Sequence, residues 1–215
     1  DQILQRGHIP FLVGGTGLYI SSVVRGYDFQ EETIDAAYRN ELEKKSLEEL
    51  QDMLSKEAKE VVGENNSDRN NKRRLIRLLE KTRNGEKLTA HNSPRYKTLQ
   101  LGVTWEKGIL HRRIDERLKK RLDQGMIDEV QSYLAAGNSP KYLYRLGLEY
   151  RYIADYLDGK YSSFEEFYDH LLQAIKRFAK RQMTWFRRDT EIHWLDMEQE
   201  YFDEACELLD GFYTK

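Results

Sequence analysis

The sequence predicts an α/β protein with a parallel sheet and a mainly helical insertion, on three observations. A short apolar run at residues 11–13 leads into a glycine-rich turn and a helical pattern, as at a buried parallel strand. Residues 33–64 are charged and carry apolar side chains at helical spacing. A second strand-like segment at 97–104 precedes amphipathic helices. Strands that alternate with helices are typical of α/β folds.

The glycine-rich turn is the strongest candidate for a ligand site. Gly14, Gly15 and Gly17 allow the backbone to turn tightly and to approach a ligand closely. Thr16 lies between a strand end and a helix start, where N–H groups and a hydroxyl are available. The order Gly-Gly-Thr-Gly matches neither the dinucleotide fingerprint nor the phosphate loop, which needs a Lys. An ordinary strand-to-helix turn is the alternative interpretation.

Length and composition exclude several classes of protein. The chain has 215 residues, enough for one sizeable core, and 33% of them are charged. No apolar run approaches the ~18 residues of a membrane span, so we expect no membrane partner, and the single cysteine suits a reducing cytoplasm. The single Cys206 excludes an internal disulfide framework and a cysteine zinc site. The net charge of −2 does not indicate nucleic acid, but the basic residues are clustered.

The first basic cluster follows the helical insertion. Within the insertion, Ser46 and Glu49 form a predicted capping box. Residues 68–80 form the next predicted helix, with Asp68 as its cap and five basic residues in nine positions. This density favours a phosphate-binding patch, and a solvated helix face is the alternative. The candidate contacts are Arg73, Arg74 and Arg77.

Residues 106–136 predict one or two amphipathic helices, with a possible break at Gly125. An arginine row at Arg113, Arg117 and Arg121 lines one helix face, and such rows are more often solvated than functional. After a turn at 137–140, residues 142–151 gather aromatic and basic side chains around one glycine.

The second basic cluster lies on the helix that begins at a predicted capping box of Ser163 and Glu166. Over residues 176–188, six basic residues interleave with Trp185 and Phe186. Cations for phosphates, flat rings for bases and an amide for base edges suit the recognition of single-stranded RNA. Residues 191–196 predict a closing strand, and residues 201–212 predict a last helix.

Ordered blocks of this sequence resemble the tRNA dimethylallyltransferase (tRNA isopentenyltransferase) family. The first block is Pro-Phe-Leu-Val-Gly-Gly-Thr-Gly-Leu-Tyr at 10–19, and the last is Ala-Lys-Arg-Gln-x-Thr-Trp-Phe-Arg at 179–187. Two further segments, at 68–80 and 142–151, lie between these blocks and also resemble the family. The departures from the family pattern are Arg69 for Pro, Leu78 for Ala, and Ile175-Lys176 where relatives tend to have Thr-Arg. In the preferred gapless alignment Glu149 replaces a Gly, and the alternative alignment on Gly147 needs a two-residue insertion.

The resemblance implies a core like that of the P-loop NTPases, which is incomplete here. The family's phosphate loop and catalytic Asp precede the first block, and this sequence contains neither. The implied domains are part of the core at 1–30, a tRNA-binding helical insertion at 31–72, and the remainder of the core with its C-terminal helices at 73–215. We expect the 215-residue chain alone to be inactive or nearly so. Turnover of dimethylallyl diphosphate by it would contradict this expectation.

The resemblance implies transfer of a dimethylallyl group from dimethylallyl diphosphate to N6 of the adenine adjacent to the anticodon (position 37) in tRNA. It implies Mg²⁺ as cofactor, with ligands in the absent front part. The partners are then the tRNA anticodon arm and dimethylallyl diphosphate, and we expect a monomer. The implied catalytic residues are Thr16 and Arg117, and the glycines 14, 15 and 17 form the diphosphate loop. The implied tRNA contacts are Thr16, Arg39, Arg73, Arg74, Arg77, Tyr150, Arg151, Lys180, Arg181, Gln182, Thr184, Trp185 and Arg187.

Two other functions stay open from the residues alone. One is an RNA-binding module without catalysis. The other is a P-loop-type kinase of a small metabolite, which would bind nucleoside triphosphates and be indifferent to RNA.

Overall fold

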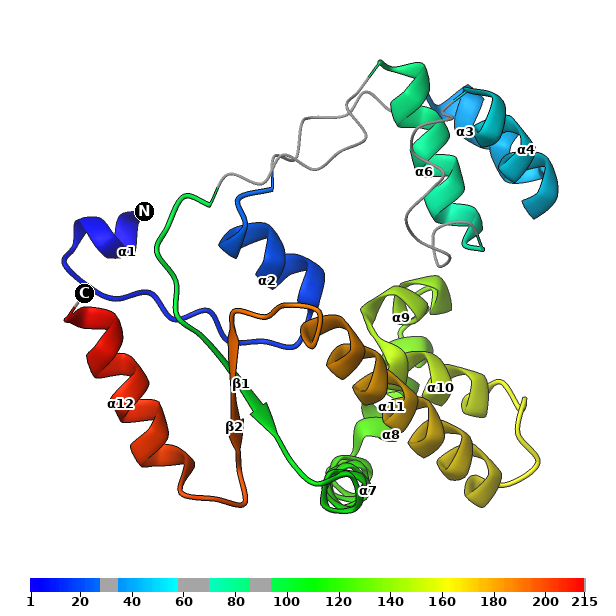
Figure 1. Ribbon diagram of the computed structural model, residues 1–215. Coiled ribbons are helices and arrows are strands. Elements are labelled where there is room, and N and C mark those ends of the chain that lie inside the picture. Colours follow the sequence, from blue (N-terminus) through cyan, green and yellow to red (C-terminus); the bar gives the residue numbers. More distant parts are fainter. Residues whose placement is uncertain (28–34, 58–69, 86–93, 215) are drawn as a thin grey trace. The chain divides into compact units, whose positions relative to one another are not determined.

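A computed structural model describes residues 1–27, 35–57, 70–85 and 94–214. The chain divides into two compact units (Figure 1). The core unit comprises Asp1–Gly17 and Thr98–Lys215, and the helical unit comprises Leu18–Lys97. These boundaries differ from the predicted ones at 30/31 and 72/73. The helix after residue 71 belongs to the helical unit, because its apolar side chains are buried there.

The sheet of the core unit consists, among the described residues, of two parallel strands. They are β1 (Gln100–Thr104) and β2 (Ile192–Asp196), paired with Gln100 opposite Ile192 and Thr104 opposite Asp196. Both strands were predicted, and the structure confirms them. The α/β class with a parallel sheet is therefore present in the described part of the chain.

The predicted strand at residues 11–13 is wrong for this structure. The segment has no regular secondary structure, and Phe11 and Val13 are 79% and 91% exposed. A strand forms only where a neighbouring strand accepts and donates its backbone hydrogen bonds. The two described strands pair with each other, and neither pairs with this segment.

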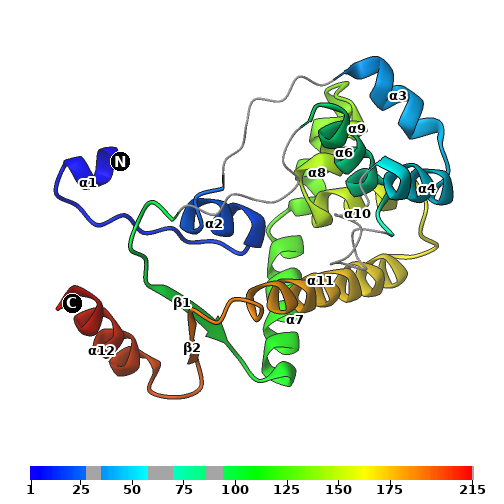
Figure 2. The same cartoon turned by 45° about the horizontal axis from the view of Figure 1, so that its top comes forward.

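The helices of the core unit follow the predicted pattern. Gly125, with φ of 90°, ends one helix and starts the next, as predicted. Helices α7 and α11 pack against each other, and Figure 2 shows them crossing. The full set is α1 (Gln2–Gln5), α7 (Lys107–Asp123), α8 (Met126–Ala135), α9 (Pro140–Leu146), α10 (Leu148–Leu157), α11 (Phe164–Phe186) and α12 (Tyr201–Tyr213).

An aromatic and aliphatic cluster fills the core between α7, α8, α9, α10 and α11. Phe167 at its centre is fully buried, and its ring stacks on Tyr156 with centroids 4.6 Å apart. The predicted capping box at the start of α11 is confirmed in part. The Ser163 hydroxyl accepts from the Glu166 N–H, while the Glu166 carboxylate accepts from the N–H and hydroxyl of Ser162 instead.

The helical unit contains α3 (Ala36–Lys44), α4 (Leu47–Glu57) and α6 (Lys72–Arg83), together with most of α2 (Gly17–Val24). Its apolar cluster is aliphatic, and α6 packs on both α3 and α4. The capping box of Ser46 and Glu49 is confirmed, with hydrogen bonds of 3.1 and 2.6 Å. The buried members of the cluster are Leu42, Leu50, Leu54, Leu75, Ile76 and Leu79.

The cap of α6 is not the predicted one. Asn71 is the N-cap, and its side-chain oxygen accepts from the N–H groups of Arg73 and Arg74. Asp68 lies outside the described residues. The amide side chain of Asn71 directly precedes the first helical turn and therefore satisfies the free N–H groups there.

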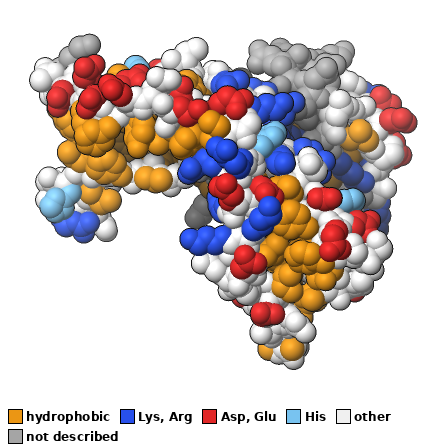
Figure 3. Space-filling model, turned by 90° about the horizontal axis from the view of Figure 1, so that it is seen from below, with side chains coloured by type: hydrophobic (Ala, Val, Ile, Leu, Met, Phe, Trp, Pro, Cys, Tyr) orange, Lys and Arg blue, Asp and Glu red, His pale blue; other side chains and the backbone are white. Residues whose placement is uncertain are grey.

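Exposed hydrophobic side chains are concentrated in parts of the core unit. Figure 3 shows hydrophobic side chains along the side on which α12 lies in Figure 1. The four most exposed large ones among the described residues are Val13, Phe11, Phe202 and Tyr19, of which Tyr19 belongs to the helical unit. No helix in the described ranges is long and apolar enough to span a membrane.

Candidate RNA-binding surfaces

The glycine-rich turn docks on the C-terminal half of α11. The side-chain amide of Gln182 donates a hydrogen bond of 2.8 Å to the carbonyl oxygen of Gly15. Gly17 lies against the indole of Trp185, and a Cβ there would stand only 2.1 Å from Trp185 Cδ1. Only glycine permits so close an approach, since real Cβ atoms do not come within 3.0 Å of another heavy atom. The structure thus brings the first and last sequence blocks together.

Thr16 lies between these two contacts and is exposed. It directly precedes α2, whose first N–H groups have no acceptor within the helix. A hydroxyl beside unpaired helix N–H groups can bind a phosphate or a polar base edge. The contacts of Gly15 and Gly17 with α11 hold the backbone on both sides of Thr16 in place.

The basic face of α11 continues from this turn to the end of the helix. Lys180 and Arg181 are exposed, as is Arg187 at the C-cap. The guanidinium of Arg181 lies 5.6 Å from the centroid of the Phe178 ring. The Thr184 hydroxyl donates to the Lys180 carbonyl oxygen one turn earlier, so this bond is internal to the helix. Cations and an indole on one helix, next to a glycine turn, form a surface suited to RNA.

The arginine row of α7 divides into three environments. Arg113 stacks over the Trp105 ring at 4.3 Å, and Arg121 forms a 2.7 Å ion pair with Glu149. Arg117, the residue implied at the diphosphate, is exposed. Arg113 and Arg121 therefore make contacts within the protein that stabilise its fold.

The pair Tyr150 and Arg151 on α10 has local contacts. The Tyr150 hydroxyl donates to Glu129 at 3.1 Å, and this hydrogen bond, together with burial, raises the pKa of Tyr150. The guanidinium of Arg151 lies 5.6 Å from the Tyr152 ring. No described contact joins this pair to the glycine turn.

The basic residues of the helical unit fall into two groups. Arg73 and Arg74 are exposed on the first turn of α6. Arg39 and Arg77 instead converge on the carboxylate of Glu80, a residue that is only 5% exposed. Sequence reasoning did not select Glu80. The sequence did contain a signal for this residue. Glu80 is the one acidic side chain of a basic helix, and it directly follows Leu79, which belongs to the apolar stripe.

Comparison with known proteins places the chain in a family. The model of the IPP transferase family matches residues 1–189. The chain belongs to the IPP transferase family. This match covers most of the chain and includes the glycine turn and the basic half of α11.

Curated relatives and solved structures of the family are similar over nearly the whole chain. The chain is 39% identical over 213 residues to tRNA dimethylallyltransferase 2 of Shewanella sediminis, covering 96% of this chain and 70% of that protein. It is 41% identical over 201 residues to tRNA dimethylallyltransferase 2 of Syntrophotalea carbinolica, covering 90% and 66%. The crystal structure of tRNA isopentenylpyrophosphate transferase from Bacillus halodurans superposes with a TM-score of 0.63 at 32% identity, covering 99% of this chain and 68% of that one. The chain thus spans about two thirds of the length of these family members.

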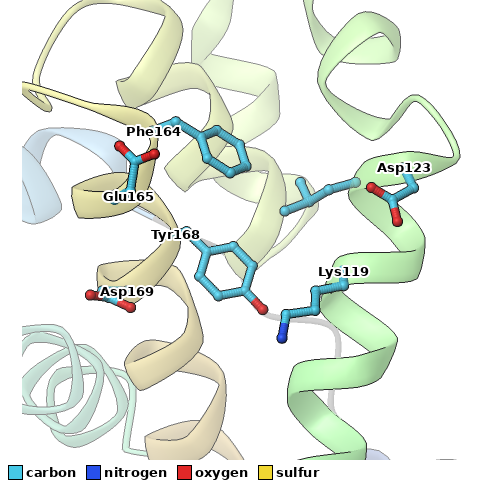
Figure 4. A pocket seen from close by; sticks show the side chains of 7 residues that line it. Lys119, Asp123, Phe164, Glu165, Tyr168 and Asp169 are labelled. Atoms are coloured by element: carbon cyan, nitrogen blue, oxygen red, sulfur yellow. The ribbon is translucent and has the colours of Figure 1, made fainter.

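A cavity of 390 Å³ between α7 and α11 contains none of the residues implied by the family resemblance (Figure 4). Beside it, Asp115 accepts hydrogen bonds from Lys119 at 2.7 Å and from the Tyr168 hydroxyl at 2.5 Å. These bonds lower the pKa of Asp115, while burial and the Asp115 carboxylate raise the pKa of Tyr168. The arrangement joins α7 and α11. Its lining residues are Lys119, Leu122, Asp123, Phe164, Glu165, Tyr168 and Asp169.

The described residues also provide no evident metal site for this family member. Nowhere in the described ranges do three or more His, Cys, Asp or Glu side chains come together in a way that could hold a metal ion. The described residues therefore supply no site in which three or more protein ligands of these types enclose a metal ion.

Proposed function

We propose that this chain acts in the transfer of a dimethylallyl group from dimethylallyl diphosphate to N6 of the adenine adjacent to the anticodon of tRNA. The observation that supports this proposal most strongly is the docking of the glycine turn on α11. Gln182 and Gly15 are 167 positions apart in sequence and share a hydrogen bond. The two segments that the proposal assigns to diphosphate and RNA are therefore in contact.

In the proposed reaction the bond between C1 of the dimethylallyl group and the diphosphate oxygen breaks, and a bond from the adenine N6 to C1 forms. The diphosphate leaves with the bonding electron pair, and N6 loses a proton to a base. Thr16 orders the target adenine or the reacting groups with its hydroxyl. Arg117 neutralises charge on the leaving diphosphate. We assign the base to none of the described residues.

The adenine must leave the stacked anticodon loop before its N6 can be reached. Trp185 and the basic side chains of α11 suit this step, since an aromatic ring replaces lost stacking and cations hold the flanking phosphates. Arg39, Arg73, Arg74 and Arg77 would hold the same arm from the helical unit. We expect the protein to act as a monomer in the cytoplasm, and to use Mg²⁺ only through ligands other than those described.

A competition experiment tests this proposal. A labelled tRNA anticodon arm is bound to the protein and then displaced by unlabelled arms that differ only at the position next to the anticodon. The adenine-containing arm should compete best. A protein that ignores all the arms and binds nucleoside triphosphate would contradict the proposal and favour a small-molecule kinase. Equal competition by every arm would favour an RNA-binding module without selection of the target base.

A further inference from the structure

The helical unit contains a buried ionic contact that the proposed function does not explain. Glu80 on α6 is 5% exposed, and its two carboxylate oxygens accept from Nε and Nη2 of Arg39 on α3 at 2.7 and 2.6 Å. Arg77, one turn before Glu80 on α6, approaches the same carboxylate at 3.6 Å. Two cations thus share one buried anion, and the cluster keeps a net positive charge.

Helix packing alone does not account for this cluster. The aliphatic side chains of α3, α4 and α6 already bury a continuous cluster. A buried ion pair contributes little net stability, because desolvation of the charges offsets most of their attraction. What a bidentate pair does contribute is orientation, since the planar guanidinium can meet both oxygens in only one arrangement.

The arginine that Glu80 holds is still accessible. The side chain of Arg39 is 33% exposed, and no described residue accepts a hydrogen bond from its Nη1. One edge of the guanidinium is therefore fixed on the carboxylate while another keeps its donor hydrogens for a ligand. A long side chain fixed before binding loses less conformational entropy when a phosphate arrives.

We propose that Glu80 is a positioning residue for tRNA binding, which presents the Nη1 edge of Arg39 to a backbone phosphate. This inference rests on the proposed function, because it requires that the helical unit bind RNA. Glu80 itself does not contact the RNA. It acts through Arg39, and Arg77 is a second cation beside the same carboxylate, at 3.6 Å.

Simple electrostatics makes the opposite prediction, and this difference provides the test. Removal of a carboxylate makes the unit more basic, so charge alone predicts that Glu80→Gln tightens RNA binding. Glu41→Gln on α3 is the matched control, since Glu41 is exposed and pairs only distantly with Lys45 at 3.8 Å. Both variants change the net charge equally, but only Glu80→Gln releases Arg39.

Binding of a labelled tRNA anticodon arm is measured by fluorescence anisotropy at one salt concentration. We expect Glu41→Gln to bind as tightly as the wild type or more tightly. Glu80→Gln should bind at least about tenfold more weakly, the lower end of the effect of one lost charge-assisted hydrogen bond. In an Arg39→Ala background, Glu80→Gln should cause no further loss. Binding by Glu80→Gln that equals or exceeds wild-type affinity would overturn the inference.

A second variant covers the case in which Glu80→Gln disturbs folding, which far-UV circular dichroism reports. Arg39→Lys keeps the charge but cannot make the two-nitrogen contact, and it should weaken binding to a similar degree while remaining folded. Wild-type affinity in Arg39→Lys would overturn the inference. If the wild type and Glu41→Gln do not bind the arm at all, the proposed function fails, and this inference fails with it.

Discussion

The α3–α4–α6 cluster of the helical unit and the N-terminal segment of the core unit differ in how completely they bury their apolar residues. The helical unit buries an aliphatic cluster between three helices, and ionic contacts such as that of Glu80 join the same helices. The core unit buries an aromatic cluster around Phe167 but leaves Phe11 and Val13 almost fully exposed. Helices satisfy their backbone hydrogen bonds internally, whereas a strand depends on its neighbours. Three packed helices can therefore bury their apolar side chains where an extended apolar segment does not. Helix α2, which lies mostly in the helical unit, also leaves Leu18, Tyr19 and Val23 exposed.

The largest expected effect contrasts two phenylalanines of the core unit. Phe167→Ala should lower the free energy of unfolding by about 3–5 kcal/mol, because it empties a fully buried site. Phe11→Ala should change it by less than about 0.5 kcal/mol, because this side chain is 79% exposed. Urea denaturation measures both. A comparable loss in the two variants would show that Phe11 is buried in solution and would remove the contrast between the units.

The next effect concerns the close contact between the glycine turn and α11. Gly17→Ala should lower the free energy of unfolding by about 1–3 kcal/mol, because the new Cβ collides with Trp185. Gly211→Ala on α12 is the control, since a Cβ there meets nothing within 4 Å and helix propensity improves. Tryptophan fluorescence should change only in Gly17→Ala. Unchanged stability and fluorescence in that variant would show that the turn does not rest on the indole.

A smaller effect depends on pH and tests the link between α7 and α11. The pKa of Asp115 is lowered by Lys119 and Tyr168, so its ionised form stabilises the fold above the ordinary carboxyl pKa near 4. Asp115→Asn should cost about 1–2 kcal/mol at pH 7, and the difference should disappear as the pH falls through the lowered pKa. Asp123→Asn, which alters an exposed carboxylate of the same helix, should cost almost nothing. A loss in Asp115→Asn that is independent of pH would exclude the ionised carboxylate as its cause.

The smallest effect is expected at the start of α4 in the helical unit. Ser46→Ala should cost about 1 kcal/mol, because the Glu49 N–H loses its acceptor. Ser55→Ala, within the same helix, removes only a bond to the carbonyl of Asp52 and should be neutral or slightly stabilising. Equal thermal midpoints for the two variants would mean that the capping box does not contribute to the stability of this unit.

Sequence patterns predicted those parts of the fold that local physics determines. Helical periodicity with a glycine break located α7 and α8, and alternating apolar residues located β1 and β2. The same reasoning failed for residues 11–13, because strand formation depends on a partner that local pattern does not reveal. The family resemblance implied a boundary at 72/73, whereas the apolar side chains of α6 are buried against α3 and α4, and an amphipathic pattern does not show which surface covers its buried face.

The candidate site was predictable in its residue types but not in its contacts. The glycine turn and the basic half of α11 were identified from their chemistry, whereas the bond from Gln182 to Gly15 follows only from the tertiary structure. Glu80 was missed because a single acid on a basic helix resembles a solvated residue in sequence. Its burial and its bidentate contact with Arg39 are visible only when α3 and α6 are packed together.

The most direct test of the central claim, that the glycine turn and the basic face of α11 form one RNA-binding surface, is the salt dependence of anticodon-arm binding in Arg181→Ala. This variant should weaken binding and reduce the slope of log K against log salt by about 0.7, the contribution of one phosphate contact to a single strand. Arg112→Ala, an exposed change on α7, should leave the slope unchanged. A slope in Arg181→Ala equal to that of the wild type would contradict the account.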